Sequence, residues 1–140
     1  DGLTATRATQ LVAHLPLTIN VLTIRNADYG FEFMEVLINR AKQFHSLERF
    51  HVCTSRVGAE EGGKQALSLR LAEIMSTNTT IKWLSLSRTS LIGTDDMEKW
   101  GDALMENKTL TTLYLREVGD EIGNHLKTKT KDRTPNLEMF

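Results

Sequence analysis

The stretch NTTIKWLSL at Asn78–Leu86 and the stretch NKTLTTLYL at Asn107–Leu115 share one pattern. In both, an Asn-x-Thr turn leads into a six-residue frame, apolar-x-x-apolar-x-apolar, which begins at residues 81 and 110. The frame also begins at residues 19 and 47, and a copy at 137 is cut short at 140, so the spacings are 28, 34, 29 and 27 residues. A frame that recurs so evenly predicts an array of structural repeats.

Each of the first four frames is followed by a glycine-containing turn and then by apolar residues three or four apart, which is the period of a helix. One strand–turn–helix unit cannot bury its apolar edge, whereas stacked units pair their strands in parallel and bury a continuous core. We therefore predict an α/β solenoid of about four repeats. Its expected parts are the helix of a preceding or capping repeat at 1–18, repeats at 19–46, 47–80, 81–109 and 110–136, and the start of a fifth at 137–140.

The predicted repeats are not identical. The repeat at 47–80 has an insertion near residues 60–65, and the repeat at 110–136 is degenerate because its helical segment runs into polar residues. In the first helix we expect Leu11 and Leu15 to face inward, and Thr94 to cap the helix of the repeat at 81–109. Because the last frame stops at Phe140, we expect further repeats or a partner to cover that end.

The units resemble leucine-rich repeats of the long, helix-containing kind found in ribonuclease inhibitor and NOD-like receptors. The likeness rests on the junctions Asn78–Leu86 and Asn107–Leu115 and extends over roughly residues 15–140. The same junctions are similar to those of the repeat domain of tropomodulin, the actin pointed-end cap. The resemblance implies a curved parallel sheet on the concave side and helices on the convex side. The family usually has Asn or Cys in the turn after each strand, and we expect irregular turns here because those positions hold Ala27, Ser55, Thr89 and Val118.

The composition predicts one intracellular domain. The 140 residues are 40% apolar, enough for one core. With 17 basic and 18 acidic residues, the net charge of −1 argues against nucleic acid or an anionic membrane as a partner. A single cysteine excludes an internal disulfide and favours a reducing compartment. No secretory leader precedes the first repeat, so we expect a cytoplasmic protein.

Two short motifs suggest chemistry and are better explained by the repeats. Gly58–Lys64 fits the G-x-x-x-x-G-K core of a phosphate-binding loop, but Gln65 stands where a hydroxyl would hold Mg²⁺, and two acidic residues inside the loop repel phosphate. Asn78 and Asn107 begin glycosylation sequons, yet both fall at the helix-to-strand turn, where Asn tolerates unusual backbone angles. We expect neither nucleotide binding nor glycosylation.

Two further groups of residues also fall short of a reactive site. His51 and Cys53 share one strand face but have no obvious orienting carboxylate and too few companions for a zinc site. We therefore expect no catalytic residue, no metal and no cofactor. The basic run Lys127–Arg133 offers charge to a phosphate or a membrane surface, although such runs are more typical of a solvated loop or frayed helix.

The side chains between the buried positions of each frame are predicted to face the concave side. Trp, Tyr and Arg dominate the energy of many interfaces, and several occur at these positions. The candidate partner-binding residues are Arg25, Arg49, His51, Trp83, Ser85, Tyr114 and Arg116. The alternative is that Trp83 only links adjacent strands.

A curved sheet without a deep pocket suits a protein partner better than a small-molecule substrate. The predicted function is a non-enzymatic protein–protein interaction scaffold or recognition segment, working within a larger assembly. The alternative is a regulatory module, such as an actin-filament-capping or GTPase-activating leucine-rich-repeat domain, and it rests on the resemblance alone.

Overall fold

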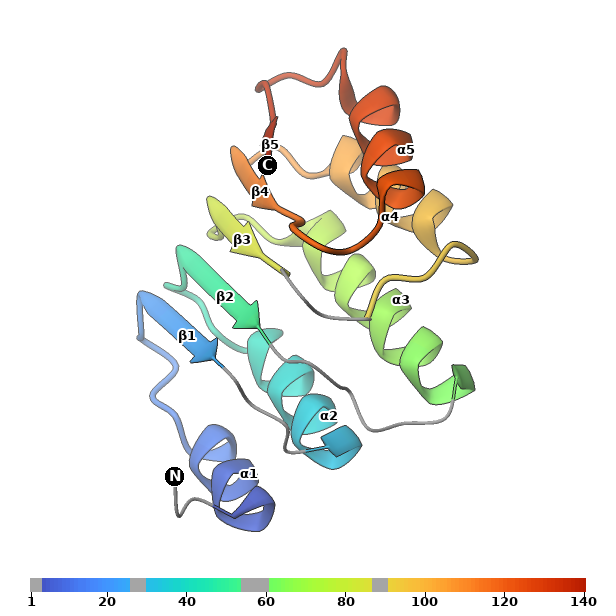
Figure 1. Cartoon of the computed structure of the whole chain (residues 1–140). Coiled ribbons are helices and arrows are strands. Elements are labelled where there is room, and N and C mark those ends of the chain that lie inside the picture. Colours follow the sequence, from blue (N-terminus) through green and yellow to red (C-terminus); the bar gives the residue numbers. More distant parts are fainter. Residues whose placement is uncertain (1–3, 26–29, 54–60, 87–90) are drawn as a thin grey trace.

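The computed structural model describes residues 4–25, 30–53, 61–86 and 91–140. Within them strands and helices alternate along the chain (Figure 1). The helices are α1 (Ala5–Ala13), α2 (Gly30–Ala41), α3 (Glu61–Thr77), α4 (Met97–Glu106) and α5 (Asp120–Thr130). The strands are β1 (Val21–Arg25), β2 (Arg49–Cys53), β3 (Trp83–Ser85), β4 (Thr112–Tyr114) and β5 (Glu138–Met139).

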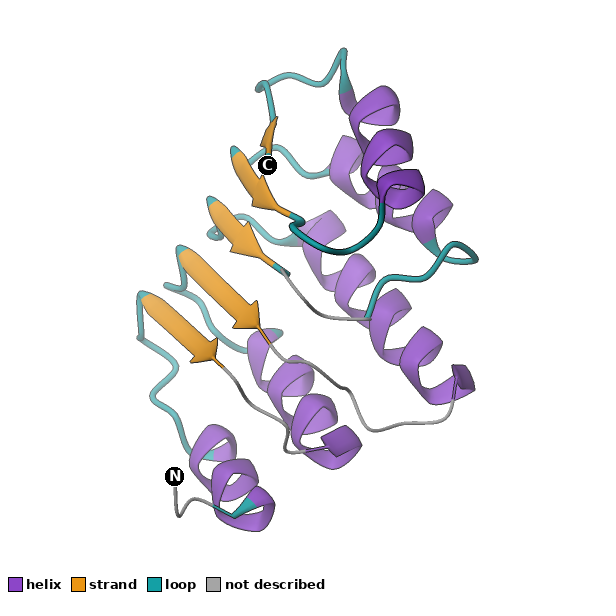
Figure 2. Ribbon diagram, viewed as in Figure 1, coloured by secondary structure: helices purple, strands orange, loops and turns teal. Residues whose placement is uncertain are grey.

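The strands form one parallel sheet in the order β1-β2-β3-β4-β5. Its register places Leu22 beside Phe50, Phe50 beside Leu84, and Leu84 beside Leu113, so the middle position of each frame is aligned across the sheet. The helices lie on one side of the sheet, and the other side, which we call the open face, carries none of the described helices (Figure 2). The predicted α/β fold with a parallel sheet is thereby confirmed.

The core lies between the sheet and the helices. Phe50, Leu84 and Leu113 are buried from the sheet side, and Trp100 and Leu126 from the helix side. Burying an apolar side chain of this size contributes about 1.5–3 kcal/mol to stability. Burial of the apolar frame residues therefore favours the stacking of one unit on the next. Leu22 is only partly buried because β1 has a neighbouring strand on one side only.

Backbone hydrogen bonds set the spacing between units where each strand begins. The Asn20 carbonyl accepts from the amides of Glu48 and Arg49, and the Glu48 carbonyl accepts from those of Lys82 and Trp83. The Lys82 carbonyl repeats the arrangement with the amides of Thr111 and Thr112. One carbonyl therefore serves two amides of the next unit, which holds successive strands in one register.

A side-chain ladder joins the units where each helix ends. Asn107 is buried, and its amide donates to the carbonyls of Met75 (2.6 Å) and Asn78 (3.2 Å). One unit later, the Arg133 guanidinium donates through Nε to the equivalent carbonyls of Leu104 (2.6 Å) and Asn107 (3.1 Å). Arg133 thus takes the place of an asparagine in the ladder.

This ladder changes the interpretation of the two sequons. Asn107 has extended backbone angles (φ −70°, ψ 129°), so an unusual conformation is not the reason for asparagine there. The reason is its side chain, whose oxygen also accepts from the amides of Thr109 (2.9 Å) and Leu110 (2.7 Å). Asn78 does the same for Thr80 (2.9 Å) and Ile81 (2.7 Å). Both asparagines recur because they close the turn before a strand.

The basic run is structural in part, contrary to the expectation of a solvated loop or frayed helix. α5 continues through Lys127 and Lys129 to Thr130, and Arg133 is only 3% exposed. Burial lowers the pKa of the Arg133 guanidinium. Its carbonyl contacts satisfy the donors that burial removes from water, which is the condition for keeping a charged group in a core.

Two local expectations are wrong. Leu11 is 55% exposed, because α1 turns Ala8 and Val12 inward instead, whereas Leu15 packs partly against the core. Thr94 is not the cap of α4, because Asp96 holds that place and its carboxylate accepts from the Gly93 amide (2.7 Å).

Two sequence motifs fall partly or wholly among residues that are not described. Three of the four turn positions, residues 27, 55 and 89, lie outside the described residues, and Val118 is half-buried. Residues 58–60 of the glycine-rich motif also lie outside them, and α3 begins at Glu61. The second half of that motif is therefore helical.

Candidate functional site

The open face is built by alternation along the strands. In β2, Phe50 and Val52 are buried on the helix side, so Arg49, His51 and Cys53 lie on the open face. Arg49 is exposed and His51 is half-buried. Arg116 is exposed just beyond β4. The alternation of Arg49 and His51 agrees with the predicted direction of their side chains, and the role of these two residues and Arg116 in binding stays a prediction.

A row of rings crosses the open face from β2 to the residue after β5. His51 stacks against Trp83 with centroids 5.8 Å apart and planes inclined by 15°. Trp83 meets Tyr114 at 5.1 Å and 47°. Tyr114 stacks against Phe140 at 4.8 Å and 20°. We call these four residues the ring row.

Phe140 is the member that sequence reasoning missed. It is 53% exposed and lies beside Tyr114, because its amide donates to the Leu113 carbonyl (3.0 Å) and its own carbonyl accepts from the Leu115 amide (2.7 Å). The incomplete last frame pointed to the wrong face for this residue. Phe140 follows Leu137 by three residues, as Leu113 follows Leu110, which predicts a buried position; the pairing of Met139 with Leu113 shifts it onto the open face.

Arg49 adds a cation to the ring row. Its guanidinium carbon lies 5.6 Å from the centroid of the Trp83 ring, within the range of a cation–π contact. Beside it, Lys82 and Glu48 form an exposed ion pair of 3.2 Å. These residues border a shallow hollow of about 320 Å³ at the start of β1 to β4, which Val21 and Thr112 also line.

One of the predicted site residues, Ser85, does not lie on the open surface as expected. Ser85 is only 1% exposed, because the register puts this small residue between His51 and Tyr114, whose larger side chains cover it. It therefore cannot contact a partner, and its assignment to the binding surface is wrong. The backbone of Arg25 pairs with Cys53 in the sheet, but its side chain lies outside what the structure describes.

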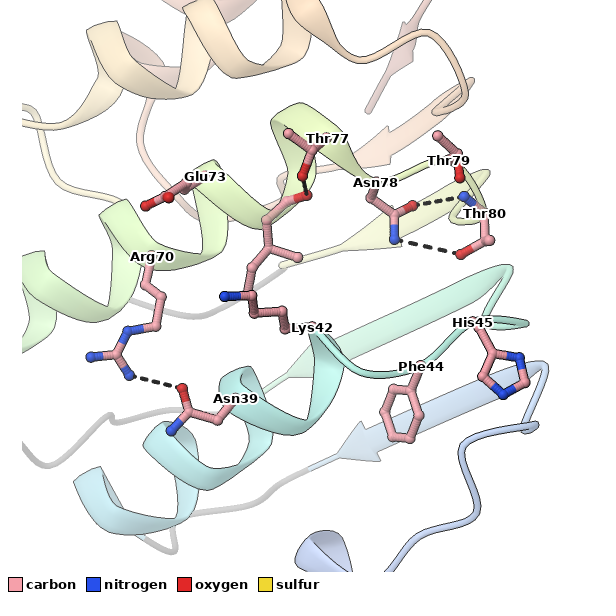
Figure 3. A pocket seen from close by; sticks show the side chains of 11 residues that line it. Asn39, Lys42, Phe44, His45, Arg70, Glu73, Thr77, Asn78, Thr79 and Thr80 are labelled. Carbon is pink, nitrogen blue, oxygen red and sulfur yellow. Dashed lines mark hydrogen bonds between the residues drawn. The ribbon is translucent and has the colours of Figure 1, made fainter.

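Another hollow lies between the ends of α2 and α3, and none of the predicted site residues lines it (Figure 3). It measures about 640 Å³, and its walls combine polar residues such as Lys42 and Glu73 with the apolar Phe44 and Ile74. Arg70 bridges it by donating to the Asn39 side-chain oxygen (3.1 Å). α2 and α3 also pack together less than the other consecutive helices of the described chain.

Charged groups gather where α4 packs against α5. Lys129 binds Glu98 (2.7 Å) and Asp102 (3.1 Å), and His125 lies 3.1 Å from Glu98. The hydrogen bond and charge of Lys129 lower the pKa of Glu98, and the hydrogen bonds that Lys129 donates to Glu98 and Asp102 raise the pKa of Lys129. This cluster is exposed and joins two helices, so we assign it to packing.

The described residues offer no metal site and no membrane-spanning helix. Among the described residues, no three His, Cys, Asp or Glu side chains are grouped so that they could hold a metal ion. The described helices include none that combines the length and the apolar character needed to cross a membrane.

Comparison with known proteins gives structural relatives only. No protein-family model matches the sequence, and no curated protein matches it significantly. Actin-binding site 2 of leiomodin-1 has a similar structure, with a TM-score of 0.71 and 17% identity over 94% of this chain and 75% of that one. The tropomodulin C-terminal domain of Caenorhabditis elegans is 14% identical over 91% of each chain, and its TM-score of 0.45 is too low to support a conclusion about the fold. The first comparison shows that the fold is leucine-rich-repeat-like.

Proposed function

We propose that this chain is a protein-binding module that contacts its partner through the open face of the sheet. The observation that carries the proposal is the ring row, in which Trp83 and Tyr114 stay partly exposed while their backbones are fixed by the sheet. Side chains held in place before binding lose little entropy when a partner arrives. Trp, Tyr and Arg together are the residue types that most often dominate interface energies.

The shape of the open face favours a macromolecule over a small substrate. Small-molecule sites bury most of the ligand in a deep cavity. The hollow beside Arg49 is shallow, and the ring row extends across four strands to Phe140. A partner that covers several strands at once uses this arrangement fully. We therefore propose binding without catalysis as its role.

The test is affinity capture from the native source with the wild-type chain and two variants, Trp83→Ala and Tyr114→Ala. We expect both variants to lose the partner, because truncation of a central aromatic residue costs about 2 kcal/mol or more, roughly a 30-fold loss of affinity. Lys99→Ala, on the exposed side of α4, is the matched control and is expected to bind normally. Retention of every partner by both aromatic variants would contradict the proposal.

A second candidate function is actin binding. Its support is that leiomodin-1 actin-binding site 2 matches 94% of this chain in three dimensions. The direct test is titration of purified actin monomers and co-sedimentation with actin filaments. Saturable binding that Trp83→Ala weakens would mean that actin is the partner and that it contacts the open face. Saturable binding that neither aromatic variant weakens would favour actin but place the contact off the open face.

A further inference from the structure

We infer that the hollow beside Arg49 receives an acidic side chain of the partner, flanked by an aliphatic one. This inference rests on the proposed binding function and names the chemistry of its central contact. The hollow lies at the start of β1 to β4, where the register aligns Val21, Arg49, Trp83 and Thr112 in one row. Arg49 supplies the charge for recognition, and Val21 and Trp83 supply its apolar part.

Arg49 provides the charge. Its guanidinium carries five N–H donors and no acceptor, and its planar shape matches a carboxylate. Among the residues that the structure describes, no carboxylate pairs with Arg49, since the nearby Glu48 is engaged by Lys82 at 3.2 Å. The contact with the Trp83 ring restrains the guanidinium, so less freedom is lost when a carboxylate binds.

Val21 and Trp83 provide the apolar part. Val21 is 57% exposed, and it is one of the few large apolar side chains that the described chain leaves open to solvent. Together with the half-buried Trp83 ring it flanks Arg49 on both sides in the register. An aliphatic group placed there removes water from the guanidinium, which strengthens a charged hydrogen bond.

The backbone carbonyls around the hollow are already engaged in hydrogen bonds and offer few acceptors to a ligand. The carbonyls of Asn20, Glu48 and Lys82 each accept two amides of the next unit. The Thr111 hydroxyl also donates to the Lys82 carbonyl (3.2 Å). Recognition must therefore come from side chains. Among them, the Arg49 guanidinium is a charged donor that no carboxylate of the described residues pairs with. This charge complementarity selects an acidic group.

The source of the carboxylate is a side chain within the partner's chain, not its C-terminus. The hollow is shallow and shares Trp83 with the ring row, which extends on to Tyr114 and Phe140. A partner that covers both surfaces continues past Arg49, so its carboxylate comes from a side chain within the chain.

The experiment is a nuclear magnetic resonance titration of the full ¹⁵N-labelled chain with short peptides. The probe is acetyl-Leu-Asp-Leu-amide, and the matched peptides are acetyl-Leu-Asn-Leu-amide, acetyl-Gly-Asp-Gly-amide and acetyl-Leu-Gly-Leu with a free carboxylate. We expect saturable shifts at Val21, Arg49, Trp83 and Thr112 with the probe, at a Kd of about 1 mM, and binding about tenfold weaker with the Asn and Gly-Asp-Gly peptides.

Variants test the role of each residue. Arg49→Gln is expected to bind the Asp and Asn peptides equally, because only the cation distinguishes them. Arg70→Gln, which alters a cation on the helix side, is expected to leave both affinities unchanged. Equal affinity of the wild type for the Asp and Asn peptides, or the absence of saturable shifts at the four residues, overturns the inference. Tighter binding of the free-carboxylate peptide than of the probe overturns the choice of a side chain as source. The proposed function is tested separately by affinity capture. If the peptide results overturn the inference but Trp83→Ala still loses its partner in the affinity capture, the proposed function stands.

Discussion

Replacing Asn107 by alanine removes a buried side chain of the ladder between units that both donates and accepts hydrogen bonds. Two of its bonds join buried groups, the donation to the Met75 carbonyl (2.6 Å) and the acceptance from the Leu110 amide (2.7 Å). Each buried polar group left unpaired costs about 1–3 kcal/mol, so the variant should lose about 4 kcal/mol of unfolding free energy. That is a large part of the roughly 5–15 kcal/mol typical of a domain.

The assay is equilibrium unfolding in urea followed by circular dichroism. With an m-value of about 2 kcal/mol per molar, a loss of 4 kcal/mol lowers the midpoint by about 2 M. Asn78→Ala provides a graded comparison, because its bonds to the amides of Thr80 and Ile81 are only partly buried, and we expect a loss of about 1–2 kcal/mol. Asn124→Ala, at an exposed position of α5, is the control and should change the free energy of unfolding by less than about 0.5 kcal/mol. A smaller loss for Asn107→Ala than for Asn78→Ala would refute this account of the ladder.

Two other predictions concern the last two helices. Arg133→Leu should lower the free energy of unfolding by about 2–4 kcal/mol in the same urea assay, because the carbonyls of Leu104 and Asn107 lose their donors; an unchanged midpoint would contradict it. For Glu98→Gln the effect should depend on pH. The folded-state pKa of Glu98 lies below its ordinary value of 4.5, so its stabilising contribution is present above that pH and is lost as the pH falls through the folded-state pKa. Midpoints of wild type and variant should therefore differ at pH 7 and converge below pH 4.5, and a constant difference would argue against the ion pair with Lys129.

The arrangement of the sheet was predictable because it follows from a repeated apolar pattern. Phe50, Leu84 and Leu113 fall at one position of the frame, and burial on one face allows only the register that aligns them. Alternation along a strand also predicted the direction of Trp83 and Tyr114. It could not predict that Ser85 is covered, because cover depends on the size of the neighbours in adjacent strands.

Other features depend on contacts between units and have no local signal. Arg133 acts as a ladder residue although an asparagine holds that place one unit earlier, and only the carbonyls of Leu104 and Asn107 reveal the equivalence. The open face is a similar case. Its directions follow from the sequence, whereas the stacking of Phe140 on Tyr114 follows from how β4 and β5 pair.

The hollow between α2 and α3 has a mechanical consequence. Consecutive helices elsewhere are held by closer packing, whereas this pair shares the polar bridge from Arg70 to Asn39 across an open gap (Figure 3). A chain stretched from its two ends should rupture at this seam first. The two parts that move apart would then be a smaller one with α1 and α2 and a larger one that keeps Asn107, Arg133 and their hydrogen bonds intact. Under load, the hydrogen bonds that pair β2 with β3 would be the last noncovalent contact between the two parts.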